Sequence, residues 1–125
     1  MAHVSSSKKL HIAEVTAEDL KRHMEAGGDL MVINVLDKKY FDDCHIKGSM
    51  SVPLDDLKSQ AASWDKNKKI VVYCASYQCS ASREAFKLLD EMGFTNIAAY
   101  EGGMKEWHEK GYPTQGACQM DYLNS

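Results

Sequence analysis

The sequence lacks any apolar run long enough to span a membrane, and its first nine residues contain no apolar signal core. It also lacks a basic stripe, so nucleic-acid binding has no electrostatic basis at a net charge of −3. No internal repeat and no linker divides the chain, and its 125 residues suit one domain with one core. We therefore expect a single cytoplasmic domain with no membrane and no nucleic-acid partner.

Four cysteines, at positions 44, 74, 79 and 118, are an even number that would allow two disulfides. A chain of this length with seven methionines does not need covalent staples, and a cytosol keeps thiols reduced. Cys74 and Cys79 have four residues between them, which is wider than the usual cysteine pair of a zinc site, and no second pair follows. We therefore expect reduced cysteines, no metal and no cofactor.

Short apolar segments alternate with amphipathic segments along the chain. The strands that we expect lie at residues 10–12, 30–35, 50–52, 70–73 and 95–100. We expect one helix after Thr16, one at 38–43, one that begins at Pro53, one that ends before Gly93, and one that contains Trp107. Such alternation predicts an α/β fold with a central parallel five-stranded sheet, helices on both faces and right-handed crossovers.

The central feature is a buried strand, Ile70 to Tyr73, followed at once by Cys74, a loop of small and polar residues, and a helix. Backbone N–H groups of such a loop and the dipole of the following helix favour a thiolate and any anion beside it. Free cysteine is also among the most buried residue types, so Cys74 could equally be a packing residue. The pattern by itself leaves both interpretations open.

Three motifs add to this pattern, and they occur in a fixed order. The first comprises Val32-Ile33-Asn34-Val35, His45-Ile46-Lys47-Gly48-Ser49 and Val52-Pro53; the second is Val71-Val72-Tyr73-Cys74; the third comprises Tyr100-Glu101-Gly102-Gly103-Met104-Lys105-Glu106-Trp107 and Gly111-Tyr112-Pro113. Together they resemble the signatures of the rhodanese-like sulfurtransferase family. The resemblance implies a rhodanese-like domain at 10–115, between a flexible N-terminal tail at 1–9 and a C-terminal tail at 116–125.

The resemblance implies sulfur transfer. The Cys74 thiolate would attack the outer sulfur of a donor, a small anion such as thiosulfate or a persulfide, and would become a persulfide itself. Cyanide or a thiol, small or on a protein, would then accept that sulfur, and the protein would act as a monomer or weak homodimer. The residues expected to form the substrate-binding loop are Ala75, Ser76, Tyr77, Gln78, Ser80, Ala81, Ser82 and Arg83. Arg83 could hold the anionic end of the donor or be an ordinary surface arginine.

The loop departs from the family pattern. In an ungapped match, Tyr77 and Cys79 stand where the family has glycine and arginine. An alignment on the following helix instead matches Ser82 to the family's serine and makes the loop two residues longer. In the first motif, Asn34, Leu36 and Cys44 replace an aspartate, an arginine and a glycine. These changes leave the identity of the donor open.

Cys79 offers a second thiol in the same loop. It could attack a persulfide or sulfenate on Cys74 and form a reversible disulfide, or it could itself be the nucleophile. We favour Cys74 because it directly follows the strand, the position from which side chains reach the crevice of an α/β sheet. We expect Cys44 to be a packing residue, and we assign no role to Cys118.

Other functions compete with sulfur transfer. A phosphatase or arsenate reductase of related fold would have arginine six residues after the cysteine, where this chain has Ser80. A non-catalytic regulatory or interaction module, or a thiol redox sensor that uses Cys74 and Cys79, is the other alternative. Persulfide formation on Cys74 distinguishes the sulfurtransferase from these.

Overall fold

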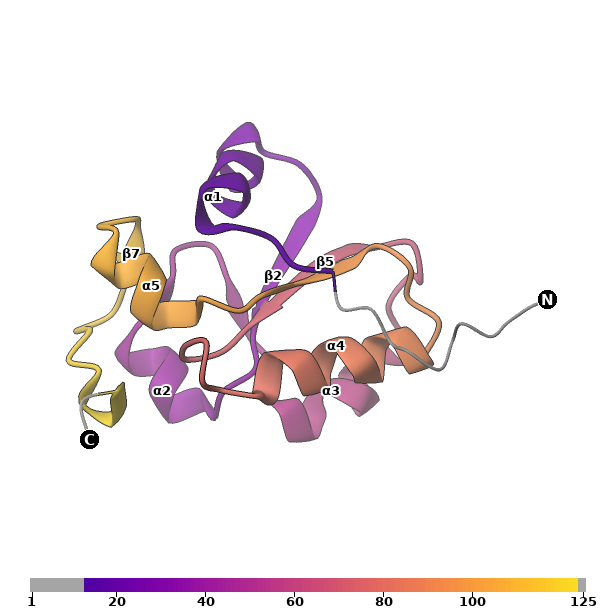
Figure 1. Ribbon diagram of the computed structural model, residues 1–125. Helices are drawn as coiled ribbons and strands as arrows, with labels where there is room; N and C mark the ends of the chain where they lie inside the picture. The colour runs from indigo at the N-terminus through magenta and orange to yellow at the C-terminus, as the bar shows by residue number, and fades with distance from the viewer. Residues whose placement is uncertain (1–12, 124–125) are drawn as a thin grey trace.

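The computed structural model describes residues 13–123 (Figure 1). Its main sheet has four parallel strands in the order β4-β2-β5-β6. These strands are β2 (Leu30–Asn34), β4 (Met50–Ser51), β5 (Lys69–Tyr73) and β6 (Ile97–Tyr100). The expected α/β class and parallel sheet are confirmed.

The expected number of five strands is wrong for the residues described. The segment 10–12, taken as the first strand, lies outside them. Next to it, Glu14 forms an isolated parallel bridge with Ala99 of β6. The Ala99 amide donates to the Ala13 carbonyl at 2.8 Å, and its carbonyl accepts from Val15 at 3.0 Å. This stretch therefore lies along the sheet edge without extending into a strand.

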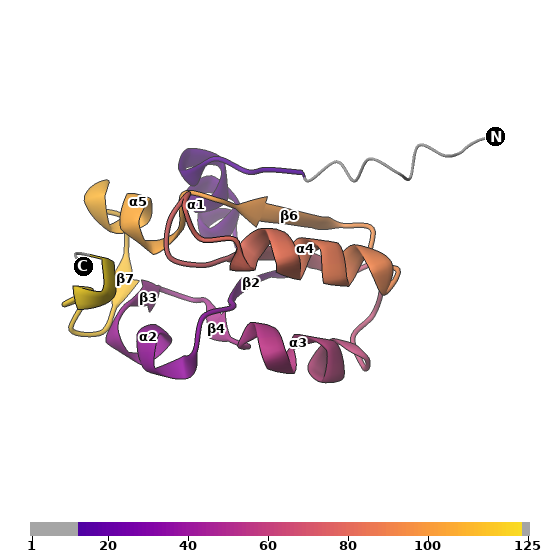
Figure 2. The same cartoon turned by 60° about the horizontal axis from the view of Figure 1, so that its bottom comes forward.

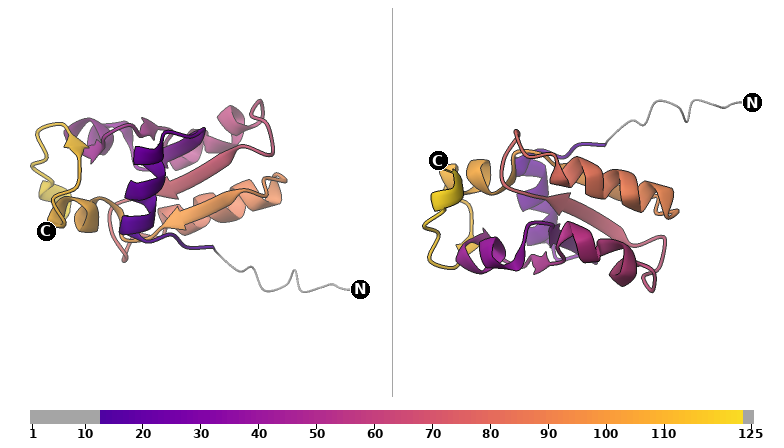
Figure 3. Two further views of the ribbon diagram at one scale, coloured as in Figure 1. Left: turned by 90° about the horizontal axis from the view of Figure 1, so that it is seen from above. Right: turned by 90° about the horizontal axis from the view of Figure 1, so that it is seen from below.

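Helices cover both faces of the sheet, as expected. They are α1 (Ala17–Ala26), α2 (Lys38–Asp43), α3 (Leu54–Ala61), α4 (Ala81–Glu91) and α5 (Gly103–Glu109). Figure 3 shows α1 in front of the sheet in one view and α3 with α4 in front of it in the opposite view. Two buried clusters of side chains fill these layers, one under α3 and α4 and the other under α1 and α5.

The strand β5 lies inside the sheet, and its last four residues are buried. Successive side chains of a strand point to opposite faces. Ile70, Val72 and Cys74 therefore pack in the layer of α3 and α4, whereas Val71 and Tyr73 pack in the layer of α1 and α5. This alternation directs the Cys74 thiol toward the beginning of α4.

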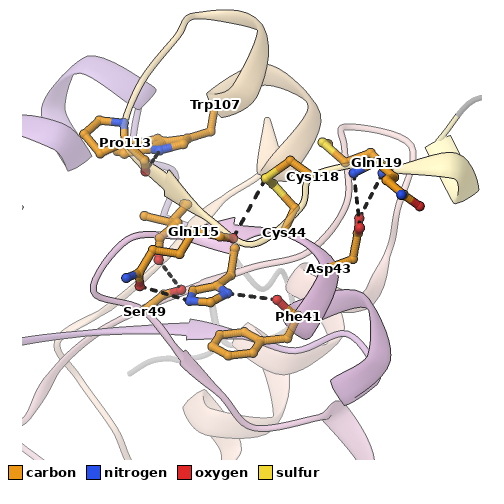
Figure 4. Close-up of a disulfide and its surroundings, with 12 residues drawn as sticks. Phe41, Asp43, Cys44, Ser49, Trp107, Pro113, Gln115, Cys118 and Gln119 are labelled. Carbon is orange, nitrogen blue, oxygen red and sulfur yellow. Dashed lines mark hydrogen bonds between the residues drawn. A yellow bond between two sulfur atoms is a disulfide. The ribbon is translucent and has the colours of Figure 1, made fainter.

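A small antiparallel sheet stands beside the main one. It pairs β3 (His45–Ile46) with β7 (Thr114–Gln115), and the short 3₁₀ helix η2 (Asp121–Leu123) follows. The His45 ring stacks on Phe41 with 3.8 Å between ring centroids, and its Nδ1 lies 2.8 Å from the Phe41 carbonyl oxygen (Figure 4). The His45 motif of the sequence thus has a structural role in joining α2 to β3.

Asp43, at the end of α2, holds the segment that follows β7. Its carboxylate accepts hydrogen bonds from the amides of Gln119 and Met120 at 3.1 and 2.9 Å, and its carbonyl accepts from the Cys118 amide at 2.7 Å (Figure 4). Gly116 passes so close that a Cβ there would lie 2.2 Å from the same carbonyl oxygen. The described part of the expected C-terminal tail is therefore packed against the domain.

The expectation that all four cysteines are reduced is wrong. Cys44 and Cys118 form a disulfide across a sequence separation of 74 residues, with 4.4 Å between their Cα atoms (Figure 4). Cys44 was expected only to pack, and Cys118 was given no role. The pair meets because Asp43 fixes the adjacent backbone of both segments, a long-range arrangement that local sequence patterns do not report. Cys74 and Cys79 are free thiols.

Candidate active site

The loop between β5 and α4 contains both free cysteines. It runs from Cys74 to Ser80, and the Cys79 amide closes a turn by donating to the Ser76 carbonyl at 3.0 Å. At its far end, the Glu84 amide donates to the Ser80 carbonyl at 3.0 Å in the first turn of α4. The turn therefore connects a strand and a helix that both pack in the core.

The near end of this loop is fixed to α5. The amides of Met104 and Lys105 donate to the carbonyls of Cys74 and Ala75 at 3.0 and 2.9 Å. Figure 2 shows the loop passing beside the start of α5. These bonds satisfy two amides of the first turn of α5, which have no partner within their own helix. The backbone at Cys74 is therefore held from two elements at once.

Gly103 makes this close approach possible. Its φ is +65°, and a Cβ there would lie 2.6 Å from the Cys74 carbonyl oxygen. The sequence contains the Gly102-Gly103 pair within its third motif, but nothing in the sequence says that this glycine touches the cysteine loop. Gly103 is a site residue that the sequence reasoning missed.

Cys74 lies at the bottom of the loop, with only 1% of its surface exposed. Its Sγ lies 3.6 Å from the Cys79 carbonyl oxygen, to which the thiol donates. A hydrogen bond with the Cys79 side chain and burial both raise the pKa of the Cys74 thiol, whereas the amide and hydroxyl of Ser82 lower it. The two larger effects favour the protonated form of the Cys74 thiol.

Cys79 is the more exposed of the two, and its pKa is shifted in the opposite direction. The hydrogen bond from Cys74 lowers the pKa of Cys79 to about 5, with further help from the amides of Ala75 and Ala81 and from the nearby Arg83 guanidinium. We expected such amide donors to act on Cys74. In the structure the amides of Ala75 and Ala81 act on the Cys79 sulfur instead.

Ser82 lies in the first turn of α4 and is fully buried. Its hydroxyl has no oxygen or nitrogen partner among residues 13–123, and it acts on the Cys74 thiol. A buried hydroxyl without such a partner is uncommon, and each case needs an explanation. The explanation here is a Cys74 sulfur that changes its charge or gains a second sulfur, with which the Ser82 hydroxyl interacts.

Three other loop residues expected to bind substrate, Ser76, Tyr77 and Ser80, use their hydroxyls in hydrogen bonds to groups other than Cys74. The Ser80 hydroxyl donates to Glu84 at 2.9 Å, and the Ser76 hydroxyl accepts from the Gln78 amide at 3.3 Å. Tyr77 is 61% exposed, and its hydroxyl donates to a carboxylate oxygen of Glu106 at 3.3 Å. The hydroxyls of Ser76 and Ser80 are thus used to shape the loop.

Arg83, for which two roles were open, pairs with Glu101. Its Nη1 lies 3.0 Å from the Glu101 carboxylate, and the two side chains are 36% and 14% exposed. A shallow pocket of about 170 Å³ beside the loop is lined by Tyr77 together with the acidic residues Glu14, Glu18, Glu101 and Glu106. The surface next to the loop is therefore acidic, and the nearby arginine is already neutralised.

Asn34, which replaces an aspartate of the family pattern, lies at the end of β2 and is fully buried. Its side-chain oxygen accepts from the Leu36 amide at 2.9 Å, so this residue shapes the chain after β2. Within residues 13–123, no three His, Cys, Asp or Glu side chains are grouped to share a metal ion. In the same part of the chain, no helix has both the length and the apolar character needed to cross a membrane.

Comparison with known proteins places this geometry in a family. The sequence model of the Rhodanese-like domain family matches residues 16–110. The chain is 26% identical over 106 residues to "Thiosulfate sulfurtransferase GlpE" of Shewanella oneidensis, a match that covers 85% of this chain and 97% of that protein. It is 24% identical over 106 residues to "Putative sulfur carrier protein YrkF" of Bacillus subtilis, and it spans 56% of the length of that protein.

A solved structure supports the same placement. The solution structure of the rhodanese-like domain of the Alr3790 protein from Anabaena superposes with a TM-score of 0.77 at 30% sequence identity, covering 88% of this chain and 83% of that one. The sequence match and the shared fold both extend over most of the described residues. The chain therefore belongs to the rhodanese-like domain family.

Proposed function

We propose that this protein is a sulfurtransferase that carries sulfane sulfur as a persulfide on Cys74. The observation that carries the proposal is the position of this thiol, directly after β5 and against the first turn of α4, with a second thiol in contact. Membership of a family that contains sulfurtransferase-named relatives supports the same chemistry. The donor is a small sulfur-containing anion or a persulfide, and the acceptor is a thiol or cyanide.

The paired thiols explain how a buried cysteine becomes a nucleophile. The raised pKa of Cys74 and the lowered pKa of Cys79 favour a pair that shares one proton and one negative charge, with the charge on Cys79. Transfer of the proton from Cys74 to Cys79, along the hydrogen bond between them, makes Cys74 the thiolate. The hydroxyl and amide of Ser82 then stabilise that charge, as preorganised donors do in other nucleophilic sites.

With thiosulfate, the Cys74 thiolate attacks the outer sulfur, the bond between the two sulfurs of the donor breaks, and sulfite leaves with the electron pair. The product is a Cys74 persulfide anion, so charge and atoms balance. The carboxylates beside the loop and the pairing of Arg83 with Glu101 favour a donor with less negative charge than this dianion. An alkyl persulfide, with one negative charge, meets that condition.

The test is the mass of the intact protein after treatment with thiosulfate or with an alkyl persulfide. We expect the gain of one sulfur atom, located on Cys74 by peptide mapping, and no gain in a Cys74→Ser variant. Cys79→Ser should form the persulfide more slowly, because it lacks the group that accepts the Cys74 proton. The persulfide that it does form should last longer, which suits mapping. An unchanged adduct in Cys74→Ser, or no adduct in wild type and Cys79→Ser alike, would reject the proposal.

The cytoplasmic location expected from the sequence stands as a proposal, and so does the monomeric or weakly dimeric state. Disulfides persist in oxidising compartments and are rare in the cytosol. The Cys44–Cys118 disulfide therefore counts against a cytoplasmic location. Rapid alkylation of cell extracts, followed by mapping of these two cysteines, tests the location directly, because reduced thiols would support the cytoplasm.

A further inference from the structure

We propose that Cys79 resolves the Cys74 persulfide by releasing hydrosulfide and forming a Cys74–Cys79 disulfide. On this proposal, which rests on the proposed persulfide at Cys74, the protein is a sulfane-sulfur reductase that consumes an external dithiol. Cyanide or a thiol acceptor is then not needed to remove the sulfur.

The geometry brings the two sulfur-bearing residues to opposite sides of one short turn. The Cys74 thiol donates to the Cys79 carbonyl at 3.6 Å, and its side chain also hydrogen-bonds that of Cys79. The Cys79 amide bonds to Ser76 and closes the turn between them. Because α5 holds the carbonyl of Cys74, the stem of the loop stays in place while the turn adjusts to a bond between the sulfurs.

The charge makes Cys79 the attacking group. In the resting pair the hydrogen bond from the Cys74 thiol lowers the pKa of Cys79 most. The amides of Ala75 and Ala81 and the Arg83 guanidinium, which also lower it, remain in place when Cys74 carries a persulfide. Cys79 is also the nearest nucleophile to a persulfide that is buried from solvent at Cys74. A tethered group in contact has a large advantage over a thiol that must diffuse into the site.

The leaving group decides which sulfur is attacked. Attack on the outer sulfur would expel the Cys74 thiolate. In the resting pair its pKa is raised most by the hydrogen bond with Cys79 and next by burial, and the effect of burial persists when Cys79 has reacted. Attack on the inner sulfur expels hydrosulfide instead. Because a thiol of lower pKa leaves faster, the second course is favoured. The pair therefore resolves the persulfide to a disulfide in preference to passing the outer sulfur from one cysteine to the other.

The step balances without an added oxidant. Cys79 gives the proton that it accepted from Cys74 to the outer sulfur of the persulfide anion, and the resulting thiolate forms a bond to the inner sulfur. The bond between inner and outer sulfur breaks, and the outer sulfur leaves as hydrosulfide with that proton and the electron pair. The sulfane sulfur is reduced, and the two cysteines are oxidised to a disulfide. An external dithiol then restores both thiols by two thiol–disulfide exchanges and becomes a disulfide itself.

The experiment is a single turnover of the reduced full-length chain with one equivalent of an alkyl persulfide, without acceptor or reductant. Hydrosulfide is trapped at the quench with a fluorescent alkylating agent, and the cysteine pairing is mapped without reduction. For wild type we expect close to one hydrosulfide per chain and a Cys74–Cys79 disulfide. Cys79→Ser should release none and should hold the persulfide on Cys74. Cys118→Ser, a matched loss of a cysteine outside the loop, should behave as wild type.

The outcomes separate this inference from the proposed function. A wild-type protein that keeps its persulfide, with no hydrosulfide and no Cys74–Cys79 disulfide, overturns the reductase and leaves the sulfurtransferase intact. No hydrosulfide and no Cys74 persulfide, in wild type and in Cys79→Ser alike, overturns the proposed function as well. Hydrosulfide released equally by wild type and Cys79→Ser assigns the reduction to another thiol and rejects the role of Cys79. Multiple turnovers with a small dithiol, present in wild type and lost in Cys79→Ser, complete the support.

Discussion

The two loop cysteines differ in environment although only four residues separate them. The sequence indicated that one thiol follows a strand, that a second lies across the same loop, and that Ser82 stands where the family has a serine. It could not show that the loop amides face Cys79, because that depends on how a loop two residues longer than the family's folds back on itself. Nor could it show that Arg83 is taken by Glu101, which lies 18 residues away along the chain.

The low pKa of Cys79 predicts its reactivity toward alkylating agents. Because the pKa is lowered to about 5, the thiolate is the main form above that pH, and alkylation should be fast and nearly constant between about pH 6 and 8. The rate should fall as the pH drops through 5. The hydrogen bond from Cys74 is the largest cause, so Cys74→Ala, which removes the donor, should move the profile to higher pH. Mass spectrometry of the Cys79 peptide over time measures this, and identical profiles for the two proteins would contradict it.

The ion pair between Arg83 and Glu101 predicts a change in donor preference. Glu101→Gln removes the carboxylate that lies 3.0 Å from the guanidinium, and it frees Arg83 to attract an anion near Cys79. We expect the KM for thiosulfate to fall by about fivefold, which corresponds to about 1 kcal/mol of binding free energy. Steady-state kinetics with thiosulfate and cyanide measures it. The double variant that adds Arg83→Gln should lose the gain, and a gain that persists there would assign it to another group.

Secondary-structure elements divide into those that local sequence determines and those that depend on distant contacts. The helix 38–43 and the Thr16 cap were predicted where the structure has them, since caps, charges and apolar spacing are local. The two-residue strands β3 and β7 were not predicted, because each pairs with the other, far along the chain, and not with the main sheet. Their pairing joins positions that are about 70 residues apart.

The junction between α5 and the cysteine loop predicts a large effect of a single methyl group. In Gly103→Ala, the new Cβ would lie 2.6 Å from the Cys74 carbonyl oxygen, so either the loop or α5 must shift. We expect a loss of more than about 2 kcal/mol in the free energy of unfolding, measured by urea denaturation. Gly93→Ala is the matched control, because Gly93 also has a positive φ of +100° but nothing within 4 Å of its Cβ position. It should lose only about 1 kcal/mol. Equal losses in the two variants would show that the contact with Cys74 adds nothing.

At the scale of the whole molecule, the family and the parallel sheet could be predicted from three motifs in order, whereas the Cys44–Cys118 disulfide could not. Reasoning from length and composition favoured reduced cysteines, and it had no means of pairing two that are 74 residues apart. The pairing depends on Asp43, whose backbone and carboxylate hold the segment after β7 against the end of α2. In the sequence, nothing distinguishes Asp43 from an ordinary surface aspartate, although its carboxylate binds two amides in the structure.

The Cys44–Cys118 disulfide predicts how much of the free energy of unfolding depends on this one bond. A disulfide that closes a loop of this length restricts the unfolded chain, and its removal typically costs about 2–4 kcal/mol. We expect Cys118→Ser to lower the free energy of unfolding by that amount, measured by urea denaturation without reductant. Cys118 is the better position for the change, because Cys44 is fully buried and its replacement would also disturb the core. With a reductant present, wild type should fall to the stability of the variant, because both then lack the bond. A wild type that is equally stable with and without reductant, while mapping shows Cys44 and Cys118 reduced, would mean that the hydrogen bonds of Asp43 hold the segment without covalent help.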